Sequence, residues 1–327
     1  MRRQKRRKEN DMLTERQRGL IKKFEELAAQ CGGSERKAGE VCGVRSSIIS
    51  QLRSETYKGV VEKQFKILED YFATKDKAAS TYSEVEYAPT TISEVVYNTL
   101  ENIKIKGGFA FVTGDAGIGK TKALRKFAAD NETNSVMITI NPCTKSTKAV
   151  LKLLALEMGV PLSQSRDDLW MSLAAKLHDG MVIAVDEAQL LTYGSIETLR
   201  SFADFFGERG QTLGVALVGN DGIREKIEGR SREQYRQVNN RAWQRQQLRT
   251  LDVQRSDIEM LIPMLSGKEQ ELEFLHKIAQ TAEGVRGAVR LFGNAYDMGS
   301  CDLDGLVRMA KMMHLDLKGM EKAVRRR

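Results

Sequence analysis

Three glycines, a lysine and a threonine at fixed spacing make residues 114–121 suitable for holding phosphate groups. The segment reads GDAGIGKT and matches the pattern G-x-x-x-x-G-K-[ST]. In such a loop, backbone N–H groups approach phosphate oxygens, the lysine reaches the terminal phosphates and the threonine hydroxyl ligates Mg²⁺. The residues expected to hold a nucleotide are Gly114, Asp115, Ala116, Gly117, Ile118, Gly119, Lys120 and Thr121. The alternative is a glycine turn beside a solvated lysine.

The residues on either side of this loop favour phosphate binding over a simple turn. Before it, residues 109–112 (FAFV) are apolar and rich in aromatic and β-branched side chains, as in a buried strand. After it, residues 122–129 place Leu124, Phe127 and Ala128 on one face of a helix. A strand, a loop and a helix in this order are the context that phosphate binding requires, because the helix turns its positive end toward the anion.

Two acidic residues follow another apolar strand and suit a metal ion and a water molecule. Residues 181–185 (MVIAV) are wholly apolar, and Asp186 and Glu187 come next. In parallel α/β sheets, ligands lie at the carboxyl ends of the strands. There, Asp186 would bind Mg²⁺ through water, and Glu187 would orient or deprotonate the water that attacks a γ-phosphate. The alternative is that the pair only caps the following helix.

A third apolar strand ends in an amide side chain. Residues 214–218 (GVALV) precede Gly219 and Asn220. At the tip of a strand beside the acidic pair, Asn220 would touch the γ-phosphate or position the attacking water. Asparagine is also frequent at such places as a turn or cap residue, which is the alternative.

Composition restricts the class of protein and its location. No apolar run approaches the roughly 18 residues that cross a membrane, so we expect no membrane partner. The four cysteines show neither metal-ligand nor disulfide spacing, which favours a reduced cytosol. The net charge of +8 favours an acidic partner, and both ends of the chain are basic. Such ends act either as DNA-binding arms or as solubilising tails.

The order of sequence patterns predicts an α/β protein with helical regions at both ends. We expect a basic disordered tail at 1–12, a helical domain at 13–73 and a polar linker at 74–91. Strands and helices then alternate over 92–251, which indicates a parallel sheet. Amphipathic helices and a basic tail follow at 252–327.

The N-terminal helical region has the layout of a helix-turn-helix. Residues 36–42 form one short helix, Gly43 supplies a turn and residues 46–52 begin a second helix. The apolar side chains expected to face the core are Val44, Ile48 and Leu52. The polar side chains expected to reach DNA are Arg45, Ser47, Ser50, Gln51 and Arg53. A helical protein-interaction domain is the alternative, because the second helix carries few positive charges.

Taken together, these motifs resemble those of an AAA+ ATPase. Residues 114–121, 186–187 and 218–220 correspond to its Walker A, Walker B and sensor 1 motifs. The resemblance implies an arginine finger at Arg241, with Arg245 as the alternative. It also implies that Arg290, in the G-x-x-R of residues 287–290, acts as sensor 2 from a helical lid formed by the last helices.

Among AAA+ proteins, the sequence resembles the family of phage Mu transposition protein B over about residues 14–320. The likeness includes VMITINP at 136–142, DEAQ at 186–189 and the helix-turn-helix. It implies a DNA-stimulated ATPase that uses ATP and Mg²⁺ and assembles as a ring or filament on double-stranded DNA, with ATP between protomers. It further implies a transposase partner and the cytoplasm of a bacterial host, with a phage or transposon as the source. A helicase loader and a nucleotide-regulated transcription regulator are the alternatives.

The same resemblance implies a second DNA contact, in the ATPase domain. After the apolar run at 136–140 comes NPCTKSTK at 141–148. In related ATPases, this loop and helix start face the central channel. The residues expected to contact DNA phosphates are Thr144, Lys145, Thr147 and Lys148. The alternative is a solvated helix N-terminus.

Overall fold

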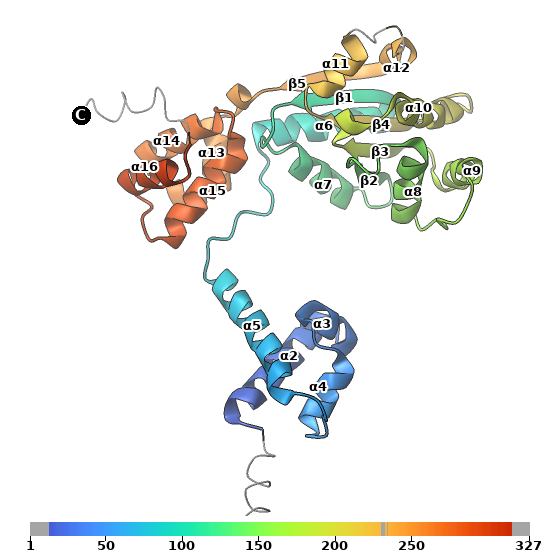
Figure 1. The fold of residues 1–327 in the computed structure, drawn as a ribbon. Coiled ribbons are helices and arrows are strands. Elements are labelled where there is room, and N and C mark those ends of the chain that lie inside the picture. Colours follow the sequence, from blue (N-terminus) through green and yellow to red (C-terminus); the bar gives the residue numbers. More distant parts are fainter. Residues whose placement is uncertain (1–12, 230–232, 234, 316–327) are drawn as a thin grey trace, which may run out of the picture. The chain divides into compact units, whose positions relative to one another are not determined.

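A computed structural model describes residues 13–229, 233 and 235–315 of the chain (Figure 1). The chain divides between Ser83 and Glu84 into two compact units, and each is described by itself. The basic tails expected at 1–12 and after the last helix fall outside the described residues. No helix in the described part of the chain combines the length and the apolar character needed to span a bilayer.

The first unit consists of helices packed around a small apolar core. Its helices are α2 (Glu15–Gln30), α3 (Glu35–Cys42), α4 (Ser46–Arg53) and α5 (Val61–Ala79). Phe24, Phe65 and Leu68 are completely buried between them. Thr14 begins α2 with a capping box, in which its hydroxyl accepts from the backbone N–H of Gln17 and the Gln17 side chain accepts in return.

Helices α3 and α4 have the two-helix layout predicted for a helix-turn-helix, and Gly43 ends the first of them. Val44 and Leu52 are buried as predicted, but Ile49 is the fully buried isoleucine, and Ile48 is only partly buried. Both isoleucines lie one helical turn before Leu52, so spacing alone does not decide which of them faces the core. The polar residues expected to reach DNA are all exposed, namely Arg45, Ser47, Ser50, Gln51 and Arg53.

Arg53, the last residue of α4, differs from the other polar residues. Its Nη2 lies 3.1 Å from an Oε1 of Glu25 and 3.0 Å from Oε1 of Glu35. Two carboxylates therefore neutralise its charge within the first unit, and they compete with any phosphate for the same guanidinium.

The predicted linker at 74–91 is too long at its start. Helix α5 continues to Ala79, because residues 75–79 (KDKAA) favour helix and the Lys23 ammonium binds Asp76 at 2.6 Å. The next helix, α6 (Thr91–Lys106), begins where Thr90 accepts from the backbone N–H of Ser93. The non-helical connection therefore runs only from 80 to 90, and its part after Ser83 belongs to the second unit.

The second unit is built on a parallel five-stranded sheet, as the α/β prediction requires. The strands are β1 (Gly108–Gly114), β2 (Ser135–Thr139), β3 (Met181–Asp186), β4 (Leu213–Gly219) and β5 (Ala242–Leu248), in the order β2-β3-β4-β1-β5. The central strands β3 and β4 are buried along their whole length. Strand β5 was not predicted, because its sequence AWQRQQL is mostly polar, as an edge strand allows.

Helices cover both faces of this sheet. They are α6, α7 (Lys120–Asp130), α8 (Thr147–Glu157), α9 (Arg166–Lys176), α10 (Tyr193–Gly207), α11 (Gly222–Glu228) and α12 (Arg236–Asn240). Helices α6 and α7 contact each other, and α8 contacts α9 and α10. The crossover from β1 to β2 runs along the sheet in the opposite direction to the crossover from β2 to β3. Because both are right-handed, α7 and α8 lie on opposite faces.

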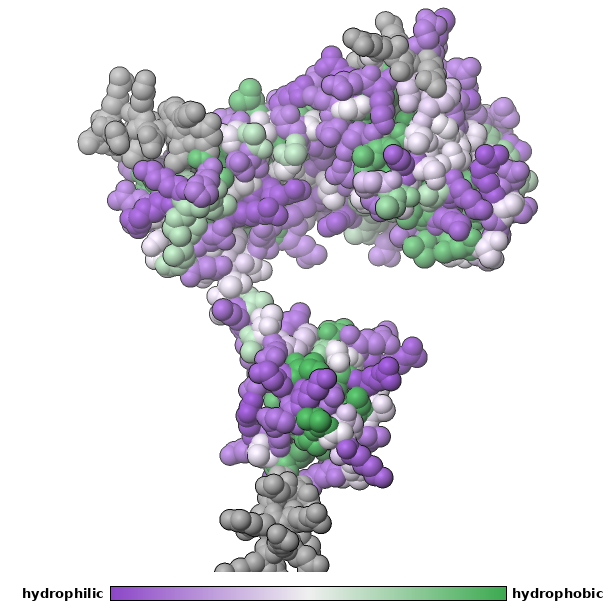
Figure 2. All heavy atoms as spheres, viewed as in Figure 1, coloured by the Kyte–Doolittle hydropathy of each residue, from purple (hydrophilic) through white to green (hydrophobic). Residues whose placement is uncertain are grey.

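The chain ends in a helical lid, in agreement with the predicted helices after residue 251. Its helices are α13 (Arg255–Leu261), α14 (Glu269–Ala279), α15 (Gly284–Asp297) and α16 (Leu303–Met312). Polar residues dominate the surface seen in Figure 2, with apolar residues in small groups. Large apolar side chains such as Phe292 and Leu275 lie inside the lid.

A buried carboxylate joins the lid to the sheet domain. Asp257 of α13 is 1% exposed, and its Oδ1 accepts from the backbone N–H of Thr91 at 2.8 Å and from its hydroxyl at 3.0 Å. Its Oδ2 accepts from the N–H of Gln254 at 2.8 Å. All three donors therefore depend on one side chain.

We expect Asp257→Ala to lower the free energy of unfolding of the second unit by about 2 kcal/mol, because three part-buried hydrogen bonds lose their charged acceptor. Both tryptophans, Trp170 and Trp243, lie in this unit, so urea unfolding followed by their fluorescence reports on it alone. Asp304→Ala, at an exposed position of α16, is the control and should change stability by less than about 0.5 kcal/mol. Equal effects of the two variants would contradict a joining role for Asp257.

Candidate nucleotide-binding site

The loop at 114–121 lies between β1 and α7, as predicted from its flanks. A Cβ atom added to Gly114 would lie 2.3 Å from the carbonyl oxygen of Leu248, so only glycine fits where β1 passes the end of β5. Gly117 and Gly119 have φ values of +74° and +103°. Helix α7 starts at Lys120, so its free N–H groups open toward the loop.

The ammonium group of Lys120 lies within the site rather than in solvent. Its Nζ donates to the carbonyl oxygens of Gly114 at 2.9 Å and Asp115 at 2.6 Å. Burial lowers the pKa of Lys120, and the nearby carboxylates of Asp186 and Glu187 partly offset that shift. A phosphate at this point would stabilise the charged lysine directly.

The structure brings together Thr121 and Asp186, which are 65 residues apart. The threonine hydroxyl donates to Oδ2 of the carboxylate at 2.7 Å, and Oδ1 accepts from the N–H of Glu187 at 3.0 Å. Hydroxyl and carboxylate oxygens suit Mg²⁺, which usually keeps few protein ligands and takes the rest from phosphates and water. Among the described residues no cluster of acidic, histidine or cysteine side chains can hold a metal by itself. The pair therefore fits a metal that arrives with a nucleotide.

A cavity of about 290 Å³ extends from this pair to the lid. The phosphate loop, Asp186, Glu187 and Asn220 line one part of it, so the structure gathers the predicted phosphate and metal residues around one space. Arg290 lines it from α15, in agreement with its predicted place in the lid. The apolar side chains that line the cavity include Val85, Tyr87, Leu261, Val285 and Val289.

The chain between residues 84 and 90 is a part of the cavity wall that the sequence analysis treated only as linker. It lies against the phosphate loop, since the Lys122 ammonium donates to the carbonyl oxygen of Val85 at 3.2 Å. The Tyr87 hydroxyl accepts from the Ser93 hydroxyl of α6 at 2.8 Å. No pattern in this short polar segment marked it as functional.

Asn220 and Glu187 are linked through a residue for which no role was predicted. The amide of Gln189, in the short helix η1 (Ala188–Leu190), donates to Oε2 of Glu187, and its Oε1 accepts from the N–H of Asn220 at 3.2 Å. The Asn220 side chain accepts from the N–H of Gly222 at 2.9 Å. The only signal in the sequence was the position of Gln189 two residues after the predicted base.

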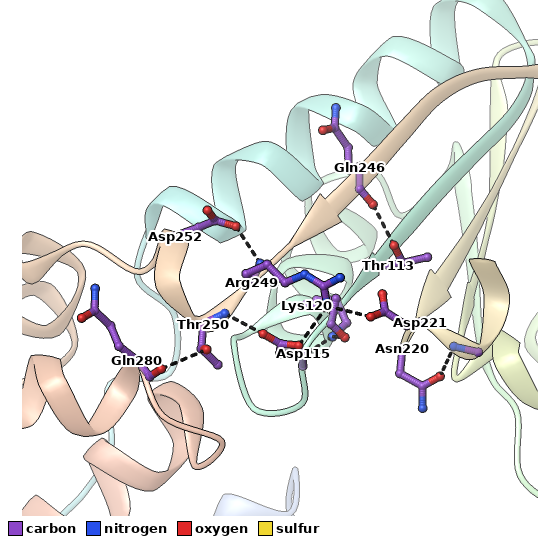
Figure 3. A network of polar contacts seen from close by, with 12 residues as sticks. Thr113, Asp115, Lys120, Asn220, Asp221, Gln246, Arg249, Thr250, Asp252 and Gln280 are labelled. Carbon is purple, nitrogen blue, oxygen red and sulfur yellow. Dashed lines mark hydrogen bonds and ion pairs between the residues drawn. The ribbon is translucent and has the colours of Figure 1, made fainter. Parts of the chain in front are cut away.

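Arg249 is a second residue that sequence reasoning missed. Together with Thr250, it links the phosphate loop, the loop after β4 and the lid (Figure 3). Its Nη1 lies 3.3 Å from Oδ1 of Asp115 in the phosphate loop and 2.6 Å from Oδ2 of Asp221, next to Asn220. The N–H of Thr250 donates to Asp115 at 2.8 Å, and its hydroxyl donates to the carbonyl oxygen of Gln280 in the lid at 3.1 Å. The hydrogen bond to Asp221 is the largest cause of the raised pKa of Arg249.

The two candidate arginine fingers do not lie at this cavity. Arg241 precedes β5, where its carbonyl oxygen accepts from the N–H of Phe109 at 3.0 Å, at the edge of the sheet where β1 begins. The phosphate loop follows the other end of β1, roughly 20 Å away at about 3.3 Å per residue. The Nε of Arg241 lies 2.9 Å from Oδ1 of Asp204. Arg245, within β5, donates through Nη2 to the carbonyl oxygen of Asn239 at 2.8 Å.

The predicted channel loop is exposed at its two lysines. Lys145 and Lys148 both reach solvent, and α8 begins between them at Thr147. The Lys145 carbonyl oxygen accepts from the Ser195 hydroxyl at 2.7 Å, which holds the loop against α10. The Thr144 hydroxyl is used within the loop, where it accepts from the N–H of Asn141 at 2.9 Å.

Comparison with known proteins supports this arrangement. Residues 104–227 match a family described as an AAA domain. A Mu-like prophage FluMu DNA transposition protein B of Haemophilus influenzae is 27% identical over 274 residues, which cover 82% of this chain and 93% of that protein. The ATP-dependent target DNA activator B of Escherichia phage Mu is 24% identical over 269 residues, covering 80% of this chain and 82% of that protein. The chain therefore carries a match to an AAA domain and is similar to these transposition and target-activating proteins over about four fifths of its length.

A solved structure shows the AAA+ fold independently of the sequence likeness. Cdc6p from Pyrobaculum aerophilum is 17% identical, with a TM-score of 0.50 over 71% of this chain and 72% of that one. The chain is therefore an ATPase by its AAA domain, and ATP is the nucleotide for which the cavity is suited.

We expect Lys120→Ala and Glu187→Gln to differ in nucleotide binding, since only Lys120→Ala should weaken it. Loss of the ammonium removes a phosphate contact, so binding of a fluorescent ATP analogue should weaken strongly. Loss of the carboxylate should leave binding intact and lower turnover by about 10²-fold or more. Arg125→Ala, at an exposed position of α7, is the control and should bind normally. Normal hydrolysis by Glu187→Gln would exclude Glu187 as the base.

Proposed function

We propose that this protein is an ATP-dependent DNA-binding ATPase, largely indifferent to sequence, which oligomerises on target DNA and recruits or activates a transposase. The observation that carries the proposal is the cavity at the Thr121–Asp186 pair, where the residues expected to hold phosphate, metal and water line one space. It occurs in a chain that aligns over four fifths of its length with an ATP-dependent target DNA activator.

The residues of the cavity divide the work of hydrolysis between them. Loop N–H groups and Lys120 bind the β- and γ-phosphates, and Thr121 and Asp186 hold Mg²⁺, which neutralises charge that develops on the phosphate oxygens. Glu187 accepts the proton of the attacking water as its oxygen bonds to the γ-phosphorus and the bond to the β-phosphate oxygen breaks. Asn220 orients the water, and Arg290 contacts the phosphates from the lid.

A second protomer completes this site in the proposed assembly. Arg241 is half exposed and lies at the edge of the sheet opposite the phosphate loop of its own chain, so it is placed to reach a neighbour. Asp204 holds its guanidinium, together with that of Arg200 on the same helix. ATP therefore lies between protomers, with Arg241 as the finger and Arg245, held within β5, as the weaker candidate.

Mixing of two inactive variants tests the shared site. Arg241→Ala alone should lose about 10³-fold in turnover, because an arginine finger stabilises charge in the transition state. Mixed with Lys120→Ala, it should regain part of the activity, since some interfaces then pair an intact loop with an intact finger. Arg166→Ala, exposed on α9, is the control for loss of an arginine. Mixtures that co-assemble without any recovery would contradict a site shared between protomers.

The chain offers two surfaces for DNA, and we propose that the channel loop carries most of the ATP-dependent affinity. Lys145 and Lys148 are exposed in the ATPase domain, whose nucleotide site controls assembly. The helix-turn-helix exposes Arg45, Ser47 and Gln51, but Arg53 is paired with Glu25 and Glu35, and Arg36 is paired with Glu40. Paired guanidinium groups are less available to phosphates, so we expect this surface to contribute less phosphate binding than the channel loop.

The salt dependence of DNA binding distinguishes the channel loop from the helix-turn-helix as the main DNA-binding surface. Each neutralised phosphate adds about 0.9 to the slope of log K against log salt, so Lys145→Ala with Lys148→Ala should flatten the slope and weaken binding on all sequences. Lys152→Ala with Lys176→Ala, two exposed lysines outside the loop, removes the same charge and should preserve the slope. Arg45→Ala with Gln51→Ala should cost little. If only this last variant loses binding, and loses it at particular sequences, the protein is an operator-reading regulator instead.

A further inference from the structure

The Gln189 side chain hydrogen-bonds to two residues of the candidate site, Glu187 and Asn220. Its side-chain amide donates to the Glu187 carboxylate, and its side-chain oxygen accepts from the backbone of Asn220. Glu187 follows β3 and Asn220 follows β4, so the contact crosses from one strand end to the next. Among the described residues, no other side chain hydrogen-bonds to both Glu187 and Asn220.

The chain around Asn220 is shaped to admit the Gln189 side chain. A Cβ atom added to Gly219 would lie 2.0 Å from Oε1 of Gln189, and one added to Gly222 would lie 3.3 Å from its Cβ. A larger residue at 219 would therefore displace the amide from its hydrogen bond with Asn220. The glycines on both sides of Asn220 in the sequence GNDG thus leave room for Gln189.

The backbone of Gln189 is fixed as well as its side chain. The Lys226 ammonium donates to its carbonyl oxygen and, at 2.8 Å, to that of Leu191. Burial, the larger cause, and the nearby Lys145 lower the pKa of Lys226. Anchored in this way by α11, the short helix η1 gives Gln189 a fixed base from which to act on its two partners.

Glu187 needs such a partner because little else restrains it. The residue is exposed and has a left-handed backbone with φ of +54°, which is uncommon for a residue with a side chain. A free glutamate has many rotamers, and a base works only when its oxygen lies within reach of the water. The Gln189 amide selects one of those rotamers.

We propose that Gln189 is the positioning residue for hydrolysis, which holds the Glu187 carboxylate in register with Asn220. It touches neither phosphate nor water itself and acts through these two residues. The proposal rests on the proposed role of Glu187 as the base. It assigns a role to Gln189, because neither the residue type nor the position of this glutamine after the acidic pair specifies one.

Three variants of Gln189 test the proposal in the full-length protein with saturating DNA. Gln189→Glu keeps the acceptor for Asn220 but sets a carboxylate against Glu187, and Gln189→Met keeps the length without either hydrogen bond. Both should lower kcat by about 10- to 100-fold, the size of effect expected from a misplaced catalytic group, while binding of a fluorescent ATP analogue stays within about twofold. Gln164→Glu is the matched control and should retain wild-type kcat, because the Gln164 side chain accepts from the Ser172 hydroxyl at 3.0 Å and does not line the cavity.

Combination with Glu187→Gln shows whether Gln189 acts through the base. In that background, Gln189→Glu should cause no further loss of turnover, because the residue it positions is already inactive. Losses that multiply would overturn the proposal, as would wild-type kcat in Gln189→Glu and Gln189→Met. If Glu187→Gln itself hydrolyses ATP normally, the proposed base has failed rather than the positioning residue, so the two failures are distinguishable.

Discussion

The parallel alignment of β1, β4 and β3 is the constraint on which the rest of the second unit depends. Parallel strands end at one edge of a sheet, so the residues that follow them must share the same space. The 2.7 Å hydrogen bond between Thr121 and Asp186 is the direct result, since these residues follow strands that both pair with β4. A register shift of one residue in β3 would turn Asp186 to the other face of the sheet and separate the pair.

The electrostatics of the site follow from that convergence. Acidic groups gather at the strand ends, where they lie close to cations or accept hydrogen bonds from backbone donors. Lys120 is flanked by Asp186 and Glu187, whereas Asp115 and Asp221 share Arg249. The Arg249 pairs are partly exposed, so they add little to stability, and their importance is in geometry. They fix the phosphate loop, the loop after β4 and the start of the lid relative to one another.

Local patterns were sufficient to predict the elements that have a buried, repetitive chemistry. The wholly apolar runs of β1, β3 and β4, the glycine pattern of the loop and the periodic helices of the lid were all predicted from the sequence. Strand β5 was not, because an edge strand that alternates polar residues resembles a loop in sequence. The length of α5 was also wrong, since part of its support is a tertiary contact from Lys23 to Asp76.

The residues that position the site were harder to find than those expected to do the chemistry. The residue types of Gln189 and Arg249 indicate no particular role, and each has a contact far along the chain, Gln189 with Asn220 and Arg249 with Asp115. The place of residues 84–90 in the cavity wall could not be predicted either, because no pattern in this short polar segment marks it. The arrangement of Arg241 away from the cavity of its own chain was consistent with the family resemblance but was not predictable from spacing.

Strand β5 lies between two arginines, with the proposed finger Arg241 just before it and Arg249 just after it. In the proposed assembly, the first arginine belongs to the neighbour's ATP and the second clamps the loops around the protein's own ATP. Strand β5 pairs with β1 from Ala242 to Leu248, with one irregularity between Phe109 and Ala110, so displacement of one end would be felt at the other. In each protomer, a change at one ATP site would then be transmitted through β5 to the next ATP site. Hydrolysis would spread through the assembly in one direction only.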